Sequence, residues 1–301
     1  MELLDLRQEG INVQENVSLS QFTFTKTGGP AEFIAFPRTI EQIKRLIEVT
    51  KENNIPLTVL GNASNLIIRD GGISGLVILL NQMNQIIALP NGRIKAYAGA
   101  RIINTSEAAY RQGLSGLEFA AGIPGSVGGA VYMNAGAYDG EVKDVLESVT
   151  VLTRDDELVT YTNADMEFAY RHSLVQENGA IVLFAIFKLQ PGELQPIRDK
   201  MDHLNDLRSA KQPLEYPSCG SVFKRPEGHY TGPLIIEAGL QGKQIGGAQV
   251  SMKHAGFIVN VDHATATDYV DLIHLIQKTI KEKYDINLET EVRIIGQNVK
   301  D

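Results

Sequence analysis

The spacing of apolar residues in the first two hundred positions switches between the helical and the strand period. An apolar stripe with helical spacing predicts a helix over residues 39–53, with Thr39 as its N-cap and Gln42 placed three residues later to complete the cap. Apolar runs and turn signals predict the remaining elements of this region: strands at 55–60, 76–80, 94–98 and 181–189, a helix at 103–111, and a hairpin of 148–153 with 157–161.

The pattern changes near residue 210. Residues 193–211 are charged and helical in spacing, and Pro213 and Pro217 then end the helix. We therefore expect a first region over 1–210, divided into parts of about 1–55 and 56–210, and a smaller domain over 211–301. In the second region we expect a short helix at 233–239, strands at 244–251 and 255–261, a long helix at 267–284 and a final strand at 288–295. Helices and strands are mixed throughout, which indicates an α+β or α/β fold.

Composition narrows the classes of function. The chain has 301 residues, 43% hydrophobic and 21% charged, as expected for a globular protein with room for two domains. No apolar stretch approaches the roughly 20 residues of a membrane span, and the start Met-Glu-Leu-Leu-Asp is acidic, so we expect a cytoplasmic protein. The net charge of −8 argues against broad nucleic-acid binding, and an anionic ligand would need local cations and backbone amides.

Cysteine and histidine usage excludes other chemistry. Cys219 is the single cysteine of the sequence, which rules out an internal disulfide and a multi-cysteine metal site. We interpret it as a small packed residue. The six histidines show no paired spacing and no H-E-x-x-H, so no metal is expected.

Two glycine-rich segments are candidates for ligand binding. The first, Gly61-Asn62-Ala63-Ser64-Asn65, follows a predicted strand, and it fits either a tight strand-exit turn or a concavity of backbone amides that holds an anion. The second, 121–130, has four glycines and a proline in ten residues and predicts a rigid loop that can lie flat against a large ligand. Neither contains G-x-G-x-x-G or G-x-x-x-x-G-K-[ST], so a Rossmann site and an ATP-driven mechanism are disfavoured.

Three polar residues have ordinary interpretations when they are taken alone. Arg171 lies in a polar stretch and fits a solvated arginine. Ser221 lies in a glycine-flanked turn without the G-x-S-x-G context of a hydrolase nucleophile, which favours a structural role. Glu291 lies in the last predicted strand, where the period of two places it on one face with Glu289 and Arg293.

Taken together, the motifs are specific. They follow one another from about residue 25 to the carboxyl terminus: Gly61–Asn65, Ile123–Gly129, Asn134–Tyr138, Tyr170–Ser173, Gly220–Lys224 and Leu288–Arg293. In this order they resemble the UDP-N-acetylenolpyruvoylglucosamine reductase (MurB) family. The short connection after Tyr138 and the segment Gln-Val-Ser-Met-Lys-His-Ala-Gly-Phe are similar to the second subtype of that family.

The resemblance implies an α+β fold in which a two-part region of the vanillyl-alcohol-oxidase type binds FAD and a smaller α+β domain binds substrate. The pyrophosphate would lie on the first glycine segment and the flavin along the second. The residues implied in FAD binding are Gly61, Asn62, Ala63, Ser64, Asn65, Gly122, Ile123, Pro124, Gly125, Ser126, Val127 and Gly128. Ala63 stands where the family usually has glycine, and alanine resists a positive φ.

The resemblance also implies a reaction. NADPH would reduce the flavin, and the flavin would reduce the enolpyruvyl ether of a UDP-sugar to a D-lactyl ether. Ser221 would protonate the substrate carbon, with Arg171 and Glu291 stabilising the enolate-like intermediate. The positions that match substrate-lining residues are Asn65, Tyr138, Lys224, Gln241, His254 and Arg293. Arg225 stands where asparagine is frequent.

Two other classes of function stay open, and each has a feature that separates it from the first. An oxidase on the same scaffold would keep the glycine segments but use oxygen as its acceptor, and the joint presence of Arg171, Ser221 and Glu291 argues against it. A nucleotide-sugar binding protein without a redox cofactor would be colourless. For the reductase we expect a monomer whose partners are the UDP-sugar and NADPH, with no nucleic acid and no membrane.

Overall fold

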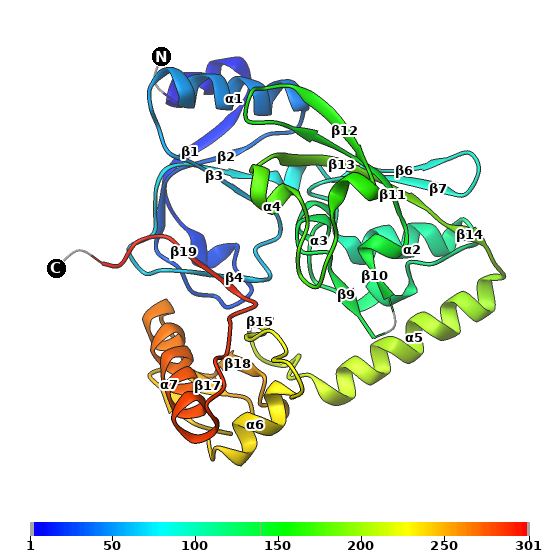
Figure 1. The fold of residues 1–301 in the computed structure, drawn as a ribbon. Coiled ribbons are helices and arrows are strands. Elements are labelled where there is room, and N and C mark those ends of the chain that lie inside the picture. The colour runs from blue at the N-terminus through cyan, green and yellow to red at the C-terminus, as the bar shows by residue number, and fades with distance from the viewer. Residues whose placement is uncertain (1–2, 139, 300–301) are drawn as a thin grey trace. The chain divides into compact units, whose positions relative to one another are not determined.

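The computed structural model describes residues 3–138 and 140–299, and the chain forms two compact units (Figure 1). Unit 1 comprises the residues up to 14, together with 34–62 and 76–208. Unit 2 comprises 15–33, 63–75 and the residues from 209 onward. The chain therefore passes between the units several times. In the described part of the chain, every helix is too short or too polar to cross a bilayer.

A four-stranded sheet has the order β1-β2-β5-β3, and β1, β2 and β5 contribute residues to both units. Its strands are β1 (Asn12–Ser18), β2 (Pro30–Phe36), β3 (Leu57–Leu60) and β5 (Ile73–Leu79). β3 and β5 pair in parallel, so a crossover connection is required, and the connecting residues from Ala63 onward belong to unit 2. Helix α1 (Ile40–Glu52) lies between β2 and β3 in the chain and buries one apolar stripe, as predicted.

At the start of α1 the predicted N-cap residue is confirmed, whereas the predicted contact of the Gln42 side chain has a different partner. The Thr39 hydroxyl accepts a hydrogen bond from the Gln42 amide at 3.2 Å, so Thr39 is the N-cap. The Gln42 side chain accepts from the Arg38 amide at 2.7 Å. The second half of the cap therefore falls one residue earlier than in a capping box.

The second sheet of unit 1 is antiparallel, in the order β12-β11-β13-β7-β6. Its strands are β6 (Ile86–Leu89), β7 (Arg93–Tyr97), β11 (Leu146–Leu152), β12 (Leu158–Thr162) and β13 (Ile181–Lys188). The predicted hairpin is confirmed, with Val149 opposite Tyr161. Helices α2 (Ile102–Arg111) and α3 (Val127–Tyr132) pack on the sheet.

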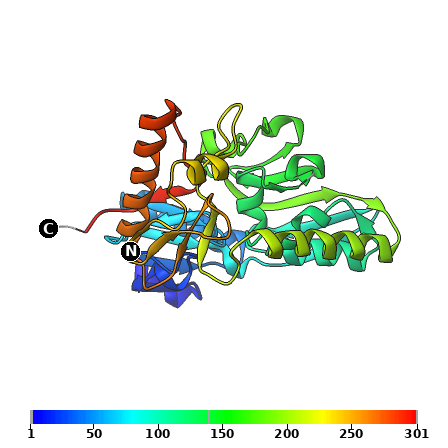
Figure 2. The same ribbon diagram turned by 90° about the horizontal axis from the view of Figure 1, so that it is seen from below.

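Helix α5 (Leu194–Lys211) runs beside α2 in both ribbon views (Figures 1 and 2). Arg198 on α5 holds Glu107 on α2 at 2.7 Å and lies over the Tyr110 ring at 4.0 Å. Short elements complete unit 1: η1 (Leu3–Glu9), η3 (Leu80–Gln82), β8 (Leu114–Ser115), η4 (Glu118–Gly122), β9 (Gly136–Ala137), β10 (Gly140–Glu141), η5 (Val142–Asp144), η6 (Ala164–Met166), α4 (Val175–Asn178) and β14 (Gln190–Pro191).

Unit 2 has its own core, formed by a sheet in the order β15-β18-β17-β16 and two helices. Its elements are η2 (Leu19–Gln21), β4 (Leu66–Ile68), β15 (Ser218–Ser221), α6 (Thr231–Glu237), β16 (Gln244–Ile245), β17 (Ala248–Val250), β18 (Phe257–Asn260), α7 (Ala266–Tyr284) and β19 (Arg293–Ile295). The long predicted helix is α7. Thr265 and Asp268 form its capping box, with bonds of 3.0 and 2.9 Å.

Two predicted strands of unit 2 are wrong, and the first is the strand at 244–251. The expected strand at 244–251 is two antiparallel strands, β16 and β17, with Ile245 opposite Ala248. Gly246 has φ +51, and a Cβ on Gly247 would come within 2.0 Å of the Asp262 carbonyl oxygen. Two adjacent glycines at these positions permit a tight hairpin turn, and this turn signal overrides the apolar run.

Candidate active site

Gly61 and Asn62, the first two residues of the first glycine-rich segment, contact the second segment in unit 1. The Asn62 side chain donates a hydrogen bond of 2.6 Å to the Pro124 carbonyl oxygen. Gly61 lies so close to Ser126 that a Cβ on Gly61 would stand 2.2 Å from the serine Oγ. The close approach of Ser126 therefore requires glycine at position 61. Gly61 and Asn62 form one side-chain-poor surface with the second segment.

The second glycine segment is shorter as a loop than predicted, because only 123–126 lies outside helices. Ser126 caps α3 by accepting from the Gly129 amide at 3.2 Å. The Val127 and Gly128 amides donate to the carbonyl oxygens of Ala100 and Ala98, both at 2.8 Å. These bonds leave the amides of Val127 and Gly128 already paired and hold the segment in a defined shape.

Ala63 keeps the backbone that glycine would favour at its position. Its φ is +46, in the left-handed region, and its side chain is buried. A left-handed alanine costs about 1 kcal/mol. The turn therefore retains the conformation of the family pattern in spite of the substitution.

Arg208, at the carboxyl end of α5, is a cation that sequence reasoning missed. Its side chain packs on Gly122, where an added Cβ would stand 2.8 Å from the arginine Cδ. Burial lowers the pKa of Arg208, while Tyr138 acts in the opposite direction. Among residues 3–138 and 140–299, no carboxylate pairs with this guanidinium. The charged helical pattern around it resembled a solvated face and carried no signal.

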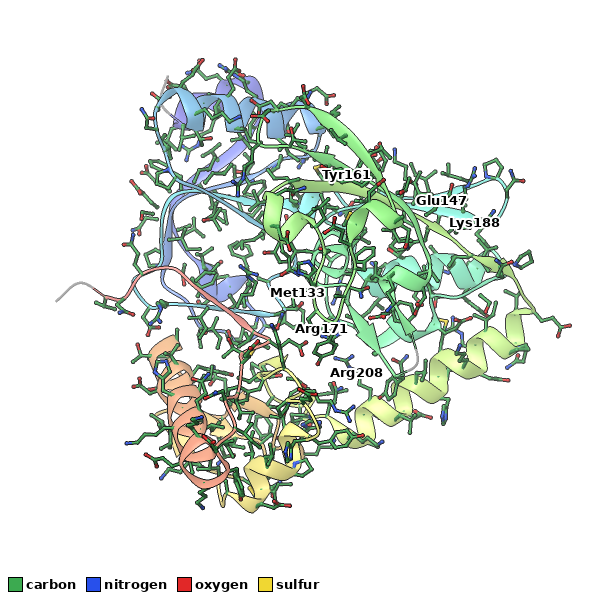
Figure 3. All side chains as sticks on the ribbon, viewed as in Figure 1. Met133, Glu147, Tyr161, Arg171, Lys188 and Arg208 are labelled. Carbon is green, nitrogen blue, oxygen red and sulfur yellow. The ribbon has the colours of Figure 1, made fainter. Side chains whose placement is uncertain are left out.

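Arg171 occupies a strained turn between η6 and α4 (Figure 3). The amide of His172 donates to the Ala169 carbonyl oxygen at 3.1 Å, which closes a two-residue turn over Tyr170 and Arg171. Arg171 has φ +56, where glycine is favoured. Its Nη2 donates to the Gly136 carbonyl oxygen at 3.4 Å, and its Cζ lies 5.0 Å from the centre of the Tyr170 ring. Strain of this kind clusters at functional sites.

In unit 2 the structure brings together the segments that carry Ser221 and Glu291. The carbonyl oxygen of Val222 accepts from the Glu291 amide at 2.8 Å, and Phe223 forms an isolated bridge with Thr290. Gly220 has φ +80, and the register of β15 against β18 shifts just before Ser221. Within the described ranges the Ser221 hydroxyl has no hydrogen-bond partner in the protein.

The predicted strand that carried Glu291 is wrong. Strand β19 begins only at Arg293, and Glu291 lies half-buried in the preceding bend. The chain changes its pairing partner at this bend. The Glu291 amide donates to the Val222 carbonyl oxygen, whereas the Arg293 amide donates to the Asn65 carbonyl oxygen at 3.2 Å. Asn65 also donates from its Nδ2 to the Glu291 carbonyl oxygen at 3.2 Å. The shorter strand leaves the alternation in place, since Leu288 and Val292 are buried whereas Glu289 and Arg293 are exposed.

Cys219 is packed, as expected. It is 3% exposed, and burial, reinforced by the charge of Glu291, raises its pKa to about 12. The thiol is therefore protonated at neutral pH, which agrees with a packing role.

The remaining substrate candidates of unit 2 have local partners. Lys224 pairs with the exposed Glu289 at 3.1 Å, a contact of little strength. Gln241 donates to the Met252 carbonyl oxygen at 2.9 Å. The ring of His254 lies edge-on to Phe257 at 4.7 Å and accepts from the Gly256 amide at 3.2 Å, and burial lowers its pKa. His254 is therefore neutral at pH 7 and stabilises its own turn.

The Arg225 side chain contacts residues of its own loop. Its Cζ lies 3.8 Å from the centre of the Tyr230 ring, and its Nε donates to the His229 carbonyl oxygen at 3.4 Å. Of the other candidates, Tyr138 and Arg171 belong to unit 1, whereas Ser221, Glu291 and Arg293 belong to unit 2.

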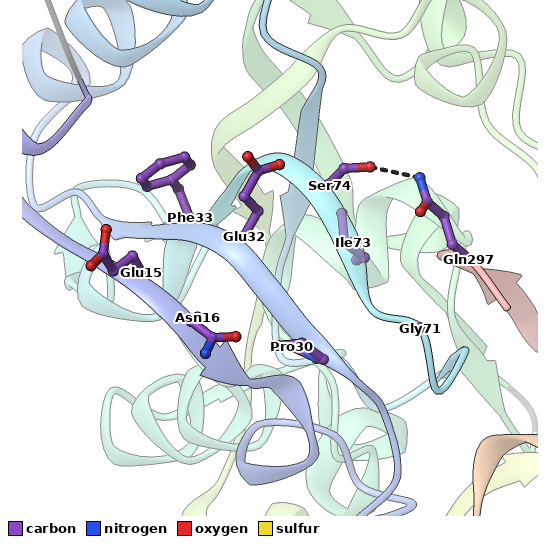
Figure 4. Close-up of a pocket in the computed structure, with 9 residues that line it drawn as sticks. All are labelled: Glu15, Asn16, Pro30, Glu32, Phe33, Gly71, Ile73, Ser74 and Gln297. Atoms are coloured by element: carbon purple, nitrogen blue, oxygen red, sulfur yellow. Dashed lines mark hydrogen bonds between the residues drawn. The ribbon is translucent and has the colours of Figure 1, made fainter. Parts of the chain in front are cut away.

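A cavity of about 430 Å³ in unit 2 lies away from these residues (Figure 4). It is lined by Glu15, Asn16, Pro30, Glu32, Phe33, Gly71, Ile73, Ser74 and Gln297. The Glu32 carboxylate accepts from the Gly75 amide at 2.7 Å, and Gln297 donates to Ser74 at 2.6 Å. No predicted site residue lines this cavity.

The chain matches two family models and a group of known relatives. Residues 31–162 match the model of an FAD binding domain, and residues 212–295 match the model of the UDP-N-acetylenolpyruvoylglucosamine reductase C-terminal domain. The chain is 67% identical to the UDP-N-acetylenolpyruvoylglucosamine reductase of Lactobacillus johnsonii over 298 residues, 99% of both chains. It is 58% identical to that of Lactiplantibacillus plantarum over 289 residues, 96% of this chain and 95% of the relative.

A solved structure of a relative has the same fold. The UDP-N-acetylenolpyruvylglucosamine reductase (MurB) of Thermus caldophilus superposes with a TM-score of 0.81 at 35% identity, covering 94% of this chain and 99% of the other. The expected fold, an α+β FAD-binding region of the vanillyl-alcohol-oxidase type followed by a smaller α+β domain, is confirmed.

Proposed function

The chain belongs to the UDP-N-acetylenolpyruvoylglucosamine reductase family, and from this premise we propose that Arg171, Ser221 and Glu291 carry its reaction. It is an FAD-dependent oxidoreductase, NADPH is its hydride donor, and it acts in the synthesis of peptidoglycan precursors. The reaction converts the enolpyruvyl ether of a UDP-linked sugar to the D-lactyl ether of UDP-N-acetylmuramate.

FAD lies on the surface that Gly61 and Asn62 share with the segment Gly122–Gly128. The close contact of Gly61 with Ser126, and the Asn62–Pro124 hydrogen bond, support this placement. Ile123, Pro124 and Gly125 present a partly exposed backbone with little side-chain bulk. Ala63, Ser64 and Asn65 complete the turn for the pyrophosphate.

Arg208 contacts a phosphate of a bound nucleotide. A half-buried guanidinium without a carboxylate partner is costly unless an anion meets it. Its contact with Gly122 places it against the proposed cofactor surface. A guanidinium is well suited to phosphate because its planar fork offers parallel donors.

The catalytic roles follow from charge and proton transfer. FAD, when bound, would supply the hydride that NADPH provides and that the terminal methylene carbon of the enolpyruvyl group accepts. Arg171 binds the substrate carboxylate and stabilises the negative charge that develops beside it, with Glu291 as a second polar contact. The Ser221 hydroxyl gives its proton to the adjacent carbon, so that one hydride and one proton saturate the double bond.

The observation that carries this proposal is the pairing of the Ser221 and Glu291 segments on the Val222 carbonyl, together with the strained backbone of Arg171. A hydroxyl without a hydrogen-bond partner in the described protein is suited to donate to substrate. Tyr138, Lys224, Gln241, His254 and Arg293 complete the proposed substrate contacts.

Half-reactions test the assignment. Ser221→Ala should leave the reduction of bound flavin by NADPH nearly intact, while reoxidation by the enolpyruvyl substrate slows by about 10²- to 10⁴-fold. Equal loss in both half-reactions would contradict the role of Ser221. Rapid reoxidation of the reduced enzyme by air would favour an oxidase, and colourless protein that takes up no FAD would favour a binding protein.

The organisation that we propose assigns residues 1–210 to FAD and 211–301 to substrate. We further propose a monomer in the cytoplasm, where NADPH and UDP-linked sugars are available. Light scattering of the purified protein measures the mass against the 33.0 kDa of one chain.

A further inference from the structure

The turn that carries Arg171 is held at both of its flanking carbonyl groups. At an arginine, the left-handed backbone of φ +56 is unfavourable by itself, so neighbouring groups must maintain it. Two side chains from other positions bind carbonyl oxygens of the turn: Asn134 binds that of Ala169, and Gln176 binds that of Arg171. The end of α3, where the labelled Met133 lies, is therefore tied to this turn (Figure 3).

Gln176 uses one amide group for two bonds. Its Nε2 donates to the Tyr132 carbonyl oxygen at 2.6 Å and to the Arg171 carbonyl oxygen at 3.0 Å. Tyr132 is the last residue of α3, so its carbonyl lacks a partner within the helix. Gln176 thus fixes the Arg171 carbonyl to the end of a packed helix.

Asn134 fixes the other side of the turn. It is fully buried, and its Nδ2 donates to the Ala169 carbonyl oxygen at 3.1 Å and to Glu141 at 2.9 Å. Its Oδ1 accepts from the Lys143 amide at 3.0 Å. The peptide group that follows Arg171 is therefore held at two points: its amide, that of His172, donates to the Ala169 carbonyl oxygen at 3.1 Å, and its carbonyl oxygen accepts from Gln176.

We propose that Gln176 is a positioning residue that holds the Arg171 guanidinium in its catalytic orientation. The inference rests on the proposed function, because it assumes that Arg171 binds the substrate carboxylate. If the Arg171 carbonyl is released, the peptide group that follows Arg171 is held by its amide alone, and the backbone at Arg171 can depart from the left-handed conformation that sets the direction of its Cα–Cβ bond. A guanidinium at the end of a long side chain then moves by several times the displacement of the backbone.

The structure supplies a matched control in Ser173. The Ser173 hydroxyl donates to the same Tyr132 carbonyl oxygen at 2.7 Å, and this hydrogen bond does not involve Arg171. Ser173→Ala therefore removes a hydrogen bond from the same helix end without releasing the Arg171 carbonyl. Gln176→Leu removes both bonds of Gln176. Gln176→Lys keeps a donor of similar reach that can serve both carbonyl oxygens.

The experiment measures the two half-reactions of the flavin-loaded enzyme by stopped-flow absorbance. Gln176→Leu should slow flavin reoxidation by the enolpyruvyl substrate by about 10- to 100-fold, since misplacement near 1 Å is enough for such a loss. Flavin reduction by NADPH should change by less than about threefold. Ser173→Ala should stay close to wild type in both, and Gln176→Lys should recover most of the lost rate.

The outcomes separate this inference from the proposed function. If Arg171→Gln leaves substrate reduction intact, the role of Arg171 is wrong, whatever Gln176 does. If Arg171→Gln abolishes substrate reduction while Gln176→Leu behaves like Ser173→Ala, the positioning role is wrong. Should Gln176→Leu fail to fold, Gln176→Glu keeps the shape but lacks the donors, and a normal rate of substrate reduction in that variant overturns the inference.

Discussion

The contact between Gly61 and Ser126 makes a quantitative prediction about the cofactor surface. An added Cβ on Gly61 would stand 2.2 Å from Ser126 Oγ and 3.3 Å from Ser126 Cβ, so the serine must move in Gly61→Ala. Ser126 is the N-cap of α3 and accepts from Gly129. Overpacking costs about 1–3 kcal/mol, and loss of the cap costs about 1 kcal/mol more. Gly61→Ala should therefore lower the free energy of unfolding by about 2–4 kcal/mol.

A double-mutant cycle isolates the cause. Ser126→Gly removes the colliding atoms, and glycine at an N-cap costs only about 0.3 kcal/mol. The double variant Gly61→Ala/Ser126→Gly should then be about as stable as Ser126→Gly alone, with a coupling energy of at least about 1.5 kcal/mol. Urea denaturation followed by circular dichroism measures all four proteins. A matched control is Gly129→Ala, whose Cβ would lie 3.4 Å from Ser126 Oγ in ordinary contact.

Flavin retention is the second assay for these variants. Gly61→Ala should release FAD during gel filtration, because the collision displaces the surface that both glycine segments share. The double variant should retain it. The reasoning is refuted if the two substitutions are additive, or if Gly61→Ala is as stable as wild type.

Four further predictions concern single residues. Arg208→Gln should weaken the affinity of the apoprotein for FAD by at least about tenfold, the value of one charge-assisted hydrogen bond. If the affinity for FAD is unchanged and KM for the UDP-sugar or for NADPH rises, Arg208 contacts a phosphate of that ligand and not of FAD. The raised pKa of Cys219 stabilises the fold below pH 9, and this contribution should be lost as pH rises toward 12; Cys219→Ala should flatten that part of the curve of urea midpoint against pH. The lowered pKa of His254 stabilises the fold above pH 6.5, and the contribution should be lost as pH falls below that value; His254→Gln should weaken the acid limb. Thr265→Ala should lower the free energy of unfolding by about 1 kcal/mol through loss of the cap of α7, as measured by urea denaturation.

Local sequence patterns determined the elements whose partners lie nearby in the chain. The apolar stripe and Thr39 were sufficient for α1, and the residues on either side of Arg154 were sufficient for the β11–β12 hairpin. Where a turn signal competed with an apolar run, the pattern failed, as at Gly246. The motifs, taken in order, were also sufficient to identify the family and its cofactor, since they record chemistry rather than geometry.

Tertiary structure decided what these patterns could not. The strand expected around Glu291 is interrupted because the chain there passes from hydrogen bonding with Val222 to hydrogen bonding with Asn65, and both partners are distant in the sequence. Arg171 has a left-handed backbone and its carbonyl oxygen accepts a hydrogen bond from Gln176, and no turn residue in the sequence signals either feature. In the sequence Arg208 resembles any arginine of a charged helix, and only the folded chain packs its side chain on Gly122. Periodicity reports the environment of a residue within its own element, whereas an unpaired charge, a strained backbone or a collision with a missing Cβ exists only between segments that folding brings together.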